Sequence, residues 1–312
     1  MINFKPIISI LFILLFICCS EPTPKEYLIT SLEIMQNNSI HKNSIDWKEL
    51  RNDSFKQLES KKTLEEVYPI IEQALEKLGT HHSFFHSPEK LAGIYDEKKT
   101  LPEIESRIIS SETAYIKIPG FLGNESLTKK FAIKIQSTIR KLDDPNVNNW
   151  IIDLTSNWGG NMWPMYLGLA PILKEGVSGY FVSPENKFLE WNFSHDAVYE
   201  GDEKMLEISN SYYLRNKNPK IAVLISRNTA SSGEAIAIMF KDFPNTKLIG
   251  EFSYGVTTGN TIYDLSDGAR IVLTTAIFAD RKKIIYGGQI TPDIFSQNPV
   301  DQAVALLNKK EE

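Results

Sequence analysis

Cysteine is scarce in this sequence and occurs at a single place. The 312 residues contain two cysteines, which are adjacent at Cys18 and Cys19. Two cysteines are too few for a disulfide framework or a four-cysteine zinc site. Because the rest of the chain has no thiol, a cysteine nucleophile in a folded domain is excluded as well.

An excess of positive charge is also absent. The chain has 34 Lys and Arg against 39 Asp and Glu, a formal net charge of −5. The basic surface typical of nucleic-acid-binding proteins is therefore not expected, and we expect no nucleic-acid partner. Glycine and proline are not enriched, at 17 and 15, whereas 42% of the residues are hydrophobic. This composition excludes a disordered or fibrous chain and can fill a sizeable core.

The first residues have the pattern of an export signal. Lys5 precedes an apolar stretch over residues 7–17. That stretch is shorter than the roughly 20 residues of a membrane span and suits the hydrophobic part of a secretory signal. The following Phe16-Ile17-Cys18-Cys19-Ser20 resembles a bacterial lipoprotein processing site, in which the cysteine after a small residue is lipidated.

The resemblance implies a lipoprotein-type signal peptide over residues 1–19 and lipid attachment at Cys19. The protein is then exported and held by its lipid on the periplasmic or cell-surface face of a bacterial membrane. The alternative is an uncleaved signal anchor with incidental cysteines.

The next part of the chain has helical patterns. Residues 20–26 are polar, contain two prolines and predict a short tether. Residues 27–105 predict a small helical subdomain. Its clearest helix begins at the capping box Thr63-x-x-Glu66, continues with apolar residues at helical spacing and ends at Gly79.

Strands and helices alternate over residues 110–308. Short apolar runs at 150–154 and 221–225 suit strands buried on both faces of a helix-covered sheet. We therefore predict an α/β (α+β) fold in which the ends of strands carry the chemistry. Further predicted elements are strands at 114–118 and 270–278 and helices at 127–142 and 235–240.

A serine-rich loop over residues 228–234 joins a predicted buried strand to a predicted helix. A serine at this junction lies at a helix N-terminus, where the helix dipole and free N–H groups favour negative charge. That environment suits both a nucleophile and the oxyanion of acyl transfer. The alternative is structural, because Ser231-x-x-Glu234 is also a capping box, which requires no catalysis.

A glycine pair follows the predicted strand at 150–154. Gly159 and Gly160 allow the backbone to approach a ligand closely and to direct its N–H groups toward it. The alternative is an ordinary turn between a strand and a helix.

Histidines gather after the capped helix. Of five in the chain, His81, His82 and His86 lie in or directly after the loop at 78–85. His82 and His86 have the spacing of zinc ligands on a helix, but Pro88 disfavours a regular helix and no third ligand is evident. One imidazole is enough for a general base that activates a serine.

Four motifs stand in order along the chain and carry a resemblance. They are Asp153-Leu154-x-x-Asn157-x-Gly159-Gly160, Thr229-Ala230-Ser231-Ser232-Gly233-Glu234, Gly250-Glu251-x-x-x-Gly255-x-Thr257-x-Gly259-Asn260 and Pro292-Asp293-Ile294. Together they resemble the tail-specific (C-terminal processing) serine peptidases, a family that also includes the tricorn core protease and interphotoreceptor retinoid-binding protein. The resemblance implies a crotonase-like ββα core, a peptide or protein substrate, and no metal or cofactor.

The resemblance also implies residue roles. Ser231 matches the nucleophile, and the N–H groups of Gly159 and Ser232 match the oxyanion hole. Val256 stands where the tail-specific branch has a lysine base, so the chain is more similar to the tricorn-type branch, whose base matches His82.

One further family position differs in this chain. Tyr286 stands where that branch has a late glutamate. In that branch the residue next to the histidine also belongs to the catalytic set, and His81 stands at that position here. Glu234 is our substitute for the missing group that orients His82. About 28 residues separate Phe85 from Ala114, too few for the PDZ domain of many relatives.

The resulting prediction is an exported, lipid-anchored serine peptidase. A non-catalytic protein that binds a peptide or a lipophilic ligand on the same fold is the alternative from another class, favoured by Val256 and Tyr286. Hydrolysis of a non-peptide ester or amide by the same residues is a third possibility.

Overall fold

The computed structural model describes residues 21–309. The predicted signal peptide and Cys19 lie outside this range. No helix within it is long and apolar enough to cross a membrane. The helices are α1 (Pro24–Asn38), α2 (Trp47–Leu58), α3 (Tyr68–Lys77), α4 (Pro88–Ile94), α5 (Glu125–Leu142), α6 (Met162–Leu173), α7 (Ser232–Met239) and α8 (Pro299–Leu307).

The strands form two sheets in this part of the chain. A largely parallel sheet has the order β13-β10-β9-β4-β3-β2, and an antiparallel sheet has the order β1-β12-β5-β6-β7-β8, with β11 also paired to β12. The strands of the parallel sheet are β2 (Ser106–Ser110), β3 (Thr113–Lys117), β4 (Asn149–Asp153), β9 (Lys220–Ile225), β10 (Thr246–Gly250) and β13 (Ile294–Phe295). Those of the antiparallel sheet are β1 (Phe84–His86), β5 (Gly176–Val182), β6 (Phe188–Ser194), β7 (Ala197–Glu200), β8 (Glu203–Glu207), β11 (Thr258–Asp264) and β12 (Arg270–Asp280).

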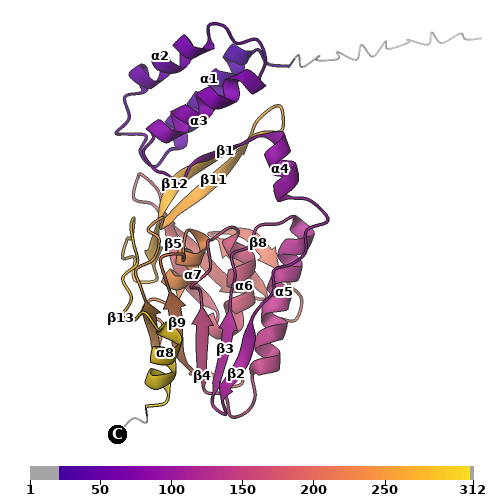
Figure 1. The fold of residues 1–312 in the computed structure, drawn as a ribbon, viewed down its shortest axis with the longest axis vertical. Helices are drawn as coiled ribbons and strands as arrows, with labels where there is room; N and C mark the ends of the chain where they lie inside the picture. The colour runs from indigo at the N-terminus through magenta and orange to yellow at the C-terminus, as the bar shows by residue number, and fades with distance from the viewer. Residues whose placement is uncertain (1–20, 310–312) are drawn as a thin grey trace, which may run out of the picture.

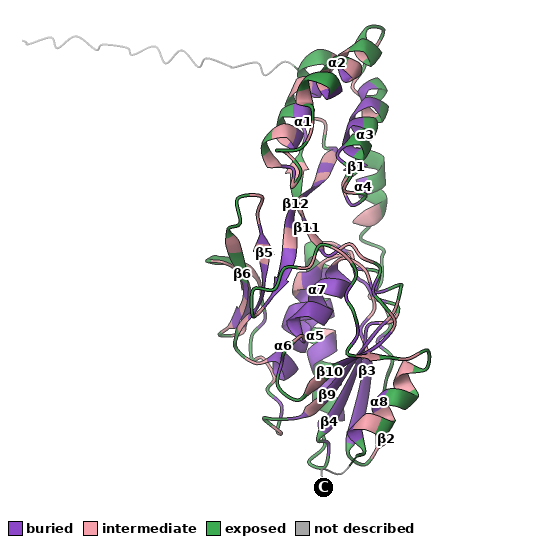
Figure 2. Cartoon of the chain, turned by 90° about the vertical axis from the view of Figure 1, so that its left-hand side faces the viewer, coloured by how far each residue is buried: buried purple, intermediate pink, exposed green. Residues whose placement is uncertain are grey.

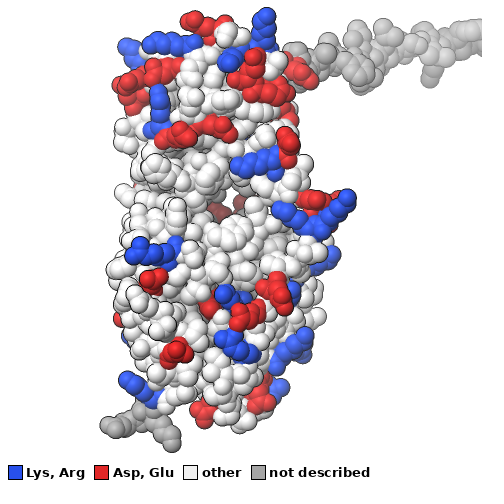
Figure 3. All heavy atoms as spheres, in the orientation of Figure 1, with Lys and Arg blue, Asp and Glu red and all other residues white. Residues whose placement is uncertain are grey.

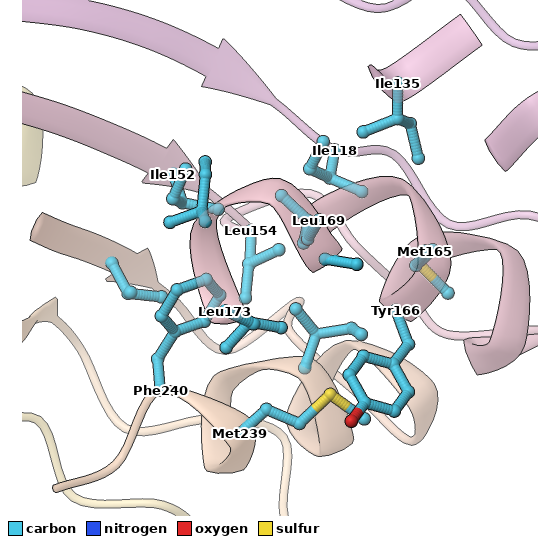
Figure 4. Close-up of a cluster of buried hydrophobic side chains, with 14 of the residues drawn as sticks. Ile118, Ile135, Ile152, Leu154, Met165, Tyr166, Leu169, Leu173, Met239 and Phe240 are labelled. Atoms are coloured by element: carbon cyan, nitrogen blue, oxygen red, sulfur yellow. The ribbon is translucent and has the colours of Figure 1, made fainter. Parts of the chain in front are cut away.

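The main core lies where α5, α6 and α7 pack between the two sheets. On β4, Trp150 and Ile152 face this core, while Ile151 faces α8 on the opposite side of the sheet. All five residues of β4 are buried, as the continuous apolar run predicts. Figure 4 shows Leu169 and Leu173 of α6 between the strands and the end of α7.

The N-terminal helices have a core of their own. Helix α1 packs on β12 and helix α3 on the neighbouring β1, and Ile271 and Leu273 of β12 belong to the same apolar cluster. Figure 1 shows these helices above the hairpin formed by β11 and β12, and Figure 2 shows the exposed outer faces of α1 and α2. The α/β fold preceded by a helical region, predicted from sequence, is therefore confirmed. The exact domain boundaries stay a prediction.

Two local predictions need correction. Helix α1 begins at Pro24 with a capping box between Thr23 and Glu26, so the predicted tether over 20–26 is too long. The helix predicted from Thr63 begins with a 3-10 turn at Glu65–Val67 and becomes α-helical at Tyr68. Pro69 follows Tyr68 directly, and because proline suits the first turn of an α-helix, it favours a start of α3 at this point.

A shared hairpin connects the helical region to the core. The tip of the β11–β12 hairpin carries Asp267, whose carboxylate accepts hydrogen bonds from the hydroxyls of Tyr27 at 2.9 and 3.0 Å and Tyr68 at 2.5 Å. Farther along the same hairpin, β12 pairs with β5 of the antiparallel sheet. The helical region is thus attached to an element that also belongs to the core.

Candidate active site

Two loops meet at one edge of the parallel sheet. Residues 154–161 follow β4 and residues 226–231 follow β9, and these strands are parallel neighbours. Their carboxyl ends therefore lie side by side, where α/β sheets place ligands. The buried Thr229 links the loops, because its hydroxyl donates to the Leu154 carbonyl at 2.9 Å.

Ser231 has an unusual backbone at this edge. It precedes α7 with φ 52° and ψ −118°, a conformation that is strained for a non-glycine residue. Its side chain is partly exposed. The Ser231 N–H donates to Glu234 Oε2 at 2.8 Å, which is the carboxylate half of the expected capping box. The sharp turn between strand and helix holds the hydroxyl at the surface, as a nucleophile requires.

The glycine pair comes close to Ser231. Gly159 has φ +104°, and a Cβ there would lie 2.9 Å from Ser231 Cβ and 3.1 Å from the Ser232 nitrogen. The Ser232 hydroxyl donates to the Gly160 carbonyl at 2.6 Å. The Gly159 N–H donates to Asn157 Oδ1 at 3.0 Å. Within residues 21–309 the N–H groups of Gly160 and Ser232 donate no hydrogen bond.

Glu234 holds a third loop against Ser231. Besides the Ser231 N–H, its buried carboxylate accepts from Ser253 Oγ at 2.5 Å, Gly255 N–H at 2.8 Å and Val256 N–H at 3.0 Å. Burial raises the pKa of Glu234 above its ordinary value, against these hydrogen bonds, which lower it. None of the four bonds reaches His82, so our hypothesis that Glu234 orients His82 is corrected: Glu234 positions backbone.

His82 is buried, with 7% of its surface exposed. Its Nδ1 lies 2.7 Å from Thr258 Oγ1, and its carbonyl accepts from Asn260 Nδ2 at 2.9 Å. Burial lowers the pKa of His82 from 6.5 to about 4, so the ring is neutral at pH 7. When Nδ1 carries the proton and donates it to Thr258, Nε2 has a free lone pair and can act as a base.

Ser231 and His82 lie on connected loops. The Glu234 carboxylate joins Ser231 to Val256, and Thr258 follows two residues later with its contact to His82. No hydrogen bond joins Ser231 to His82 in the described chain. Such bonds are often long without substrate and shorten in the complex.

The other predicted positions around His82 do not contact it. His81 is exposed with φ 49°, and the Tyr286 hydroxyl donates to Asp280 Oδ2 at 3.1 Å. The metal alternative needed His82 and His86 on one helix face, but His86 ends strand β1. Among residues 21–309 no three His, Cys, Asp or Glu side chains gather as metal ligands.

Thr258 is the partner of His82 that sequence reasoning missed. It lies between Thr257 and Gly259, at an unspecified position of the third motif that carries the family resemblance. The two partners are 176 residues apart. No local spacing indicates such a pair, and the β11–β12 hairpin brings it together.

The chain is similar to known proteins in both sequence and fold. The family model described as "Peptidase family S41" matches residues 112–296. A curated relative, "Nisin-resistance protein" of Lactococcus lactis subsp. lactis, is 31% identical over 290 residues, which cover 93% of this chain and 88% of that protein. A "Probable CtpA-like serine protease" of Staphylococcus epidermidis is 25% identical over 176 residues. This alignment covers 56% of the chain and 33% of the relative, so the chain matches about a third of that protein.

Two solved structures are similar to this chain in fold. "Structure of a lipoprotein from Streptococcus agalactiae" has a TM-score of 0.79 and 26% identity, covering 92% of this chain and 97% of that one. "Photosystem II D1 C-terminal processing protease" has a TM-score of 0.63 at 15% identity, covering 93% and 98%, and shows the shared fold alone.

Proposed function

The chain belongs to peptidase family S41 and is a serine peptidase, and from this premise we propose that it is an exported, lipid-anchored enzyme in which Ser231 and His82 hydrolyse peptide bonds. One observation carries the assignment of the nucleophile. Ser231 has a strained backbone and is partly exposed at a strand–helix junction. Gly159 lies so close to it that a side chain at position 159 would collide with Ser231.

In each half of the proposed reaction His82 takes one proton and gives one proton back. Ser231 Oγ attacks the peptide carbonyl carbon while His82 Nε2 takes the hydroxyl proton. The protonated His82 then gives this proton to the leaving amine nitrogen, and the C–N bond breaks. In the second half, His82 Nε2 takes a proton from water while the water oxygen attacks the acyl-enzyme. His82 then returns this proton to Ser231 Oγ as the bond to the acyl group breaks and the acid is released.

Thr258 serves as a positioning residue in this scheme. By accepting the proton of His82 Nδ1, its hydroxyl selects the tautomer whose Nε2 is free to act as the base. The oxygen also stabilises the positively charged ring that forms during attack. A neutral side chain thereby takes the place that a carboxylate has in the Ser-His-Asp arrangement.

The oxyanion is proposed to bind to backbone N–H groups at the start of α7. The Ser232 N–H belongs to the first turn, where helix donors are free. Gly159 is the sequence-based candidate for the second donor, but its N–H is held by Asn157 Oδ1. We assign the second donor to Gly160, and give Gly159 the role of permitting close approach to Ser231.

Export and lipid attachment at Cys19 are supported by the sequence of residues 1–20 and by the likeness to a streptococcal lipoprotein. The full chain expressed in a bacterium should fractionate with membranes, and Cys19→Ser should release it or leave its precursor unprocessed. Cys18→Ser is the matched control, because serine keeps a small residue before Cys19. Membrane retention and normal processing of Cys19→Ser would refute the anchor.

The name of one relative suggests a first substrate. Because the chain is 31% identical to a nisin-resistance protein over almost its whole length, we propose nisin or a related antimicrobial peptide as substrate. Incubation of the full chain in detergent with nisin, followed by mass spectrometry, should reveal two product fragments.

The nucleophile is tested with matched serine variants. Ser231→Ala should abolish cleavage and labelling by a fluorophosphonate, and His82→Ala should lower both by roughly 100-fold or more. Ser137→Ala, at an exposed serine on α5, should behave as wild type. Peptidase activity that survives intact in Ser231→Ala would overturn the proposal, and labelling without cleavage of any peptide would favour an ester or amide substrate instead.

A further inference from the structure

Each of the three chain segments that carry the site residues exposes at least one large aromatic side chain. Three of them are Phe84, Trp158 and Tyr254, with 41%, 56% and 63% of their surface exposed. We call these three residues the aromatic rim. A single exposed aromatic needs no explanation, but one on every loop around a nucleophile is a pattern. Each lies one or two residues from a group that the site uses.

Trp158 has a fixed orientation. It directly precedes Gly159, and its indole lies against Gly120, where a Cβ would be 2.7–2.8 Å from three of the ring atoms. The absence of a side chain at Gly120 therefore lets the ring lie close on the backbone. Consecutive Cα atoms are 3.8 Å apart, so Trp158 Cα is within about 7.6 Å of Gly160 Cα. A ring held in this way, and still more than half exposed, is a preformed platform beside the proposed oxyanion site.

Tyr254 lies on the loop that Glu234 holds. Its N–H donates to the Thr229 carbonyl at 2.9 Å, and its two neighbours, Ser253 and Gly255, both donate to Glu234. The backbone on either side of Tyr254 is thus fixed to the Ser231 loop, while the ring remains open to solvent. This geometry gives the loop a rigid base and an exposed apolar tip.

Phe84 extends the rim on the side of His82. Its ring meets the His82 ring edge-on, with centroids 5.8 Å apart, and stacks on His86 at 6.2 Å. On β12 its cross-strand neighbour is Val272, which pairs on its other side with the exposed Ile262 of β11. An apolar row therefore crosses the sheet beside the general base.

Formal charge is missing from the same loops. Residues 78–85, 118–123, 154–161 and 252–263 contain no Asp, Glu, Lys or Arg. Figure 3 shows a hollow between the helical region and the core, with mainly uncharged side chains around its opening and Asp or Glu atoms visible in its depth. A charged side chain in this position would lose water without gaining a partner, which costs free energy. An apolar side chain would gain from burial against the rim.

We propose that the aromatic rim forms the substrate subsites, and that the peptides cleaved carry bulky apolar, uncharged residues on both sides of the scissile bond. This proposal rests on the proposed function, since it names the substrate class of the same site. Stacking on Trp158 makes that residue a determinant of specificity.

A peptide library tests the rim. Fluorogenic peptides varied on both sides of the cleaved bond are incubated with the full chain in detergent, and cleavage sites are mapped by mass spectrometry. Wild type should prefer Phe, Leu, Ile or Met near the bond over Asp, Glu and Lys. Trp158→Ala should lower kcat/KM for the preferred peptides by roughly tenfold, through KM, and flatten the preference. Trp158→Phe should restore most of it.

Tyr213→Ala is the matched control, because Tyr213 is 43% exposed but contacts Glu175 and Lys217 instead of the site. Its profile should equal that of wild type. A Ser231-dependent activity with no apolar preference, or with a preference unchanged in Trp158→Ala, would overturn the rim while leaving the proposed function intact. Failure of wild type to cleave any peptide would instead overturn the proposed function, and the rim with it.

Discussion

Replacement of Thr258 by valine isolates the contact that orients His82. Valine keeps the branched shape at the start of β11 and removes the oxygen that lies 2.7 Å from His82 Nδ1. The buried ring then has no acceptor for a proton on Nδ1, because no other hydrogen bond to this nitrogen exists among residues 21–309. The proton is expected to move to Nε2, the nitrogen that acts as the base in the proposed reaction.

The size of the effect follows from the burial of the ring. Leaving a buried donor without a partner costs about 1–3 kcal/mol. The active tautomer is disfavoured by that amount, which corresponds to a loss in kcat/KM of roughly 5- to 150-fold. Loss of the base altogether, in His82→Ala, should cost at the upper end of the roughly 100- to 10,000-fold range of general-base catalysis. Thr258→Val should therefore lie between wild type and His82→Ala.

The assay is kcat/KM for a cleaved peptide between pH 4 and 8, with thermal unfolding to check the fold. His82 is neutral at pH 7 in both proteins, since its pKa is already about 4, so the difference at pH 7 reports the tautomer and not ionisation. Thr258→Ser keeps the hydroxyl and should retain most of the activity. If Thr258→Val matches wild type across this range, Thr258 does not position His82 and the reasoning fails.

Three further outcomes are expected. Activity should stay level from pH 7 to about 5 and fall as His82 gains a proton near its pKa of about 4. Because this pKa lies below the unfolded value of 6.5, His82 should also contribute a decrease of about 3 kcal/mol in the free energy of unfolding between pH 6.5 and 4, and the total decrease should be smaller by that amount in His82→Ala. Glu234→Gln should lower the free energy of unfolding, measured in urea, by about 2 kcal/mol and should reduce kcat. The cause is that the amide nitrogen of glutamine cannot accept a hydrogen bond, so the four donors lose part of their acceptor. An unchanged urea midpoint would contradict this. Asp267→Ala removes the acceptor of Tyr27 and Tyr68 and should speed amide hydrogen exchange in α1 more than in α5, whereas equal protection would show that apolar packing alone docks the helices.

The parts of the fold that sequence predicted best are continuous apolar runs and strong helix periodicity. The runs at 150–154 and 221–225 form β4 and β9, and the stripe at 127–142 forms α5, each within two residues of its predicted bounds. These segments are buried on both faces or on one stripe, so the pattern alone determines their conformation.

The meander of β5 to β8 was not predicted. Burial along these strands is irregular: in β6 two exposed residues stand in succession, and the register shifts within β5 and β7. A bulge moves side chains to the opposite face and interrupts the alternation that identifies a strand. Such strands are defined by their cross-strand partners, which sequence does not display.

The candidate site, like the fold, could be predicted from the sequence only in part. Ser231, Gly159 and Ser232 could be singled out from the sequence because they lie on loops that follow recognisable buried strands, and their roles stay a prediction. Glu234 was offered as a substitute for the group that orients His82, yet its carboxylate binds the loop at 253–256. Thr258 carried no signal, because its role arises where β11 meets a loop 176 residues earlier. Contacts across such distances depend on the assembled fold.

The neutral partner of His82 has a consequence for the proposed reaction. A base with a pKa of about 4 is always available at pH 7, but protonating it costs about 3 kcal/mol more than for an ordinary histidine. Among residues 21–309 no carboxylate forms a hydrogen bond or ion pair with the ring to offset this cost. The negative oxyanion forms in the same step, however, and two opposite charges in a site of low dielectric attract strongly. The base is therefore effective only while a carbonyl occupies the oxyanion site, which confines proton removal from Ser231 to the complex with a correctly placed substrate.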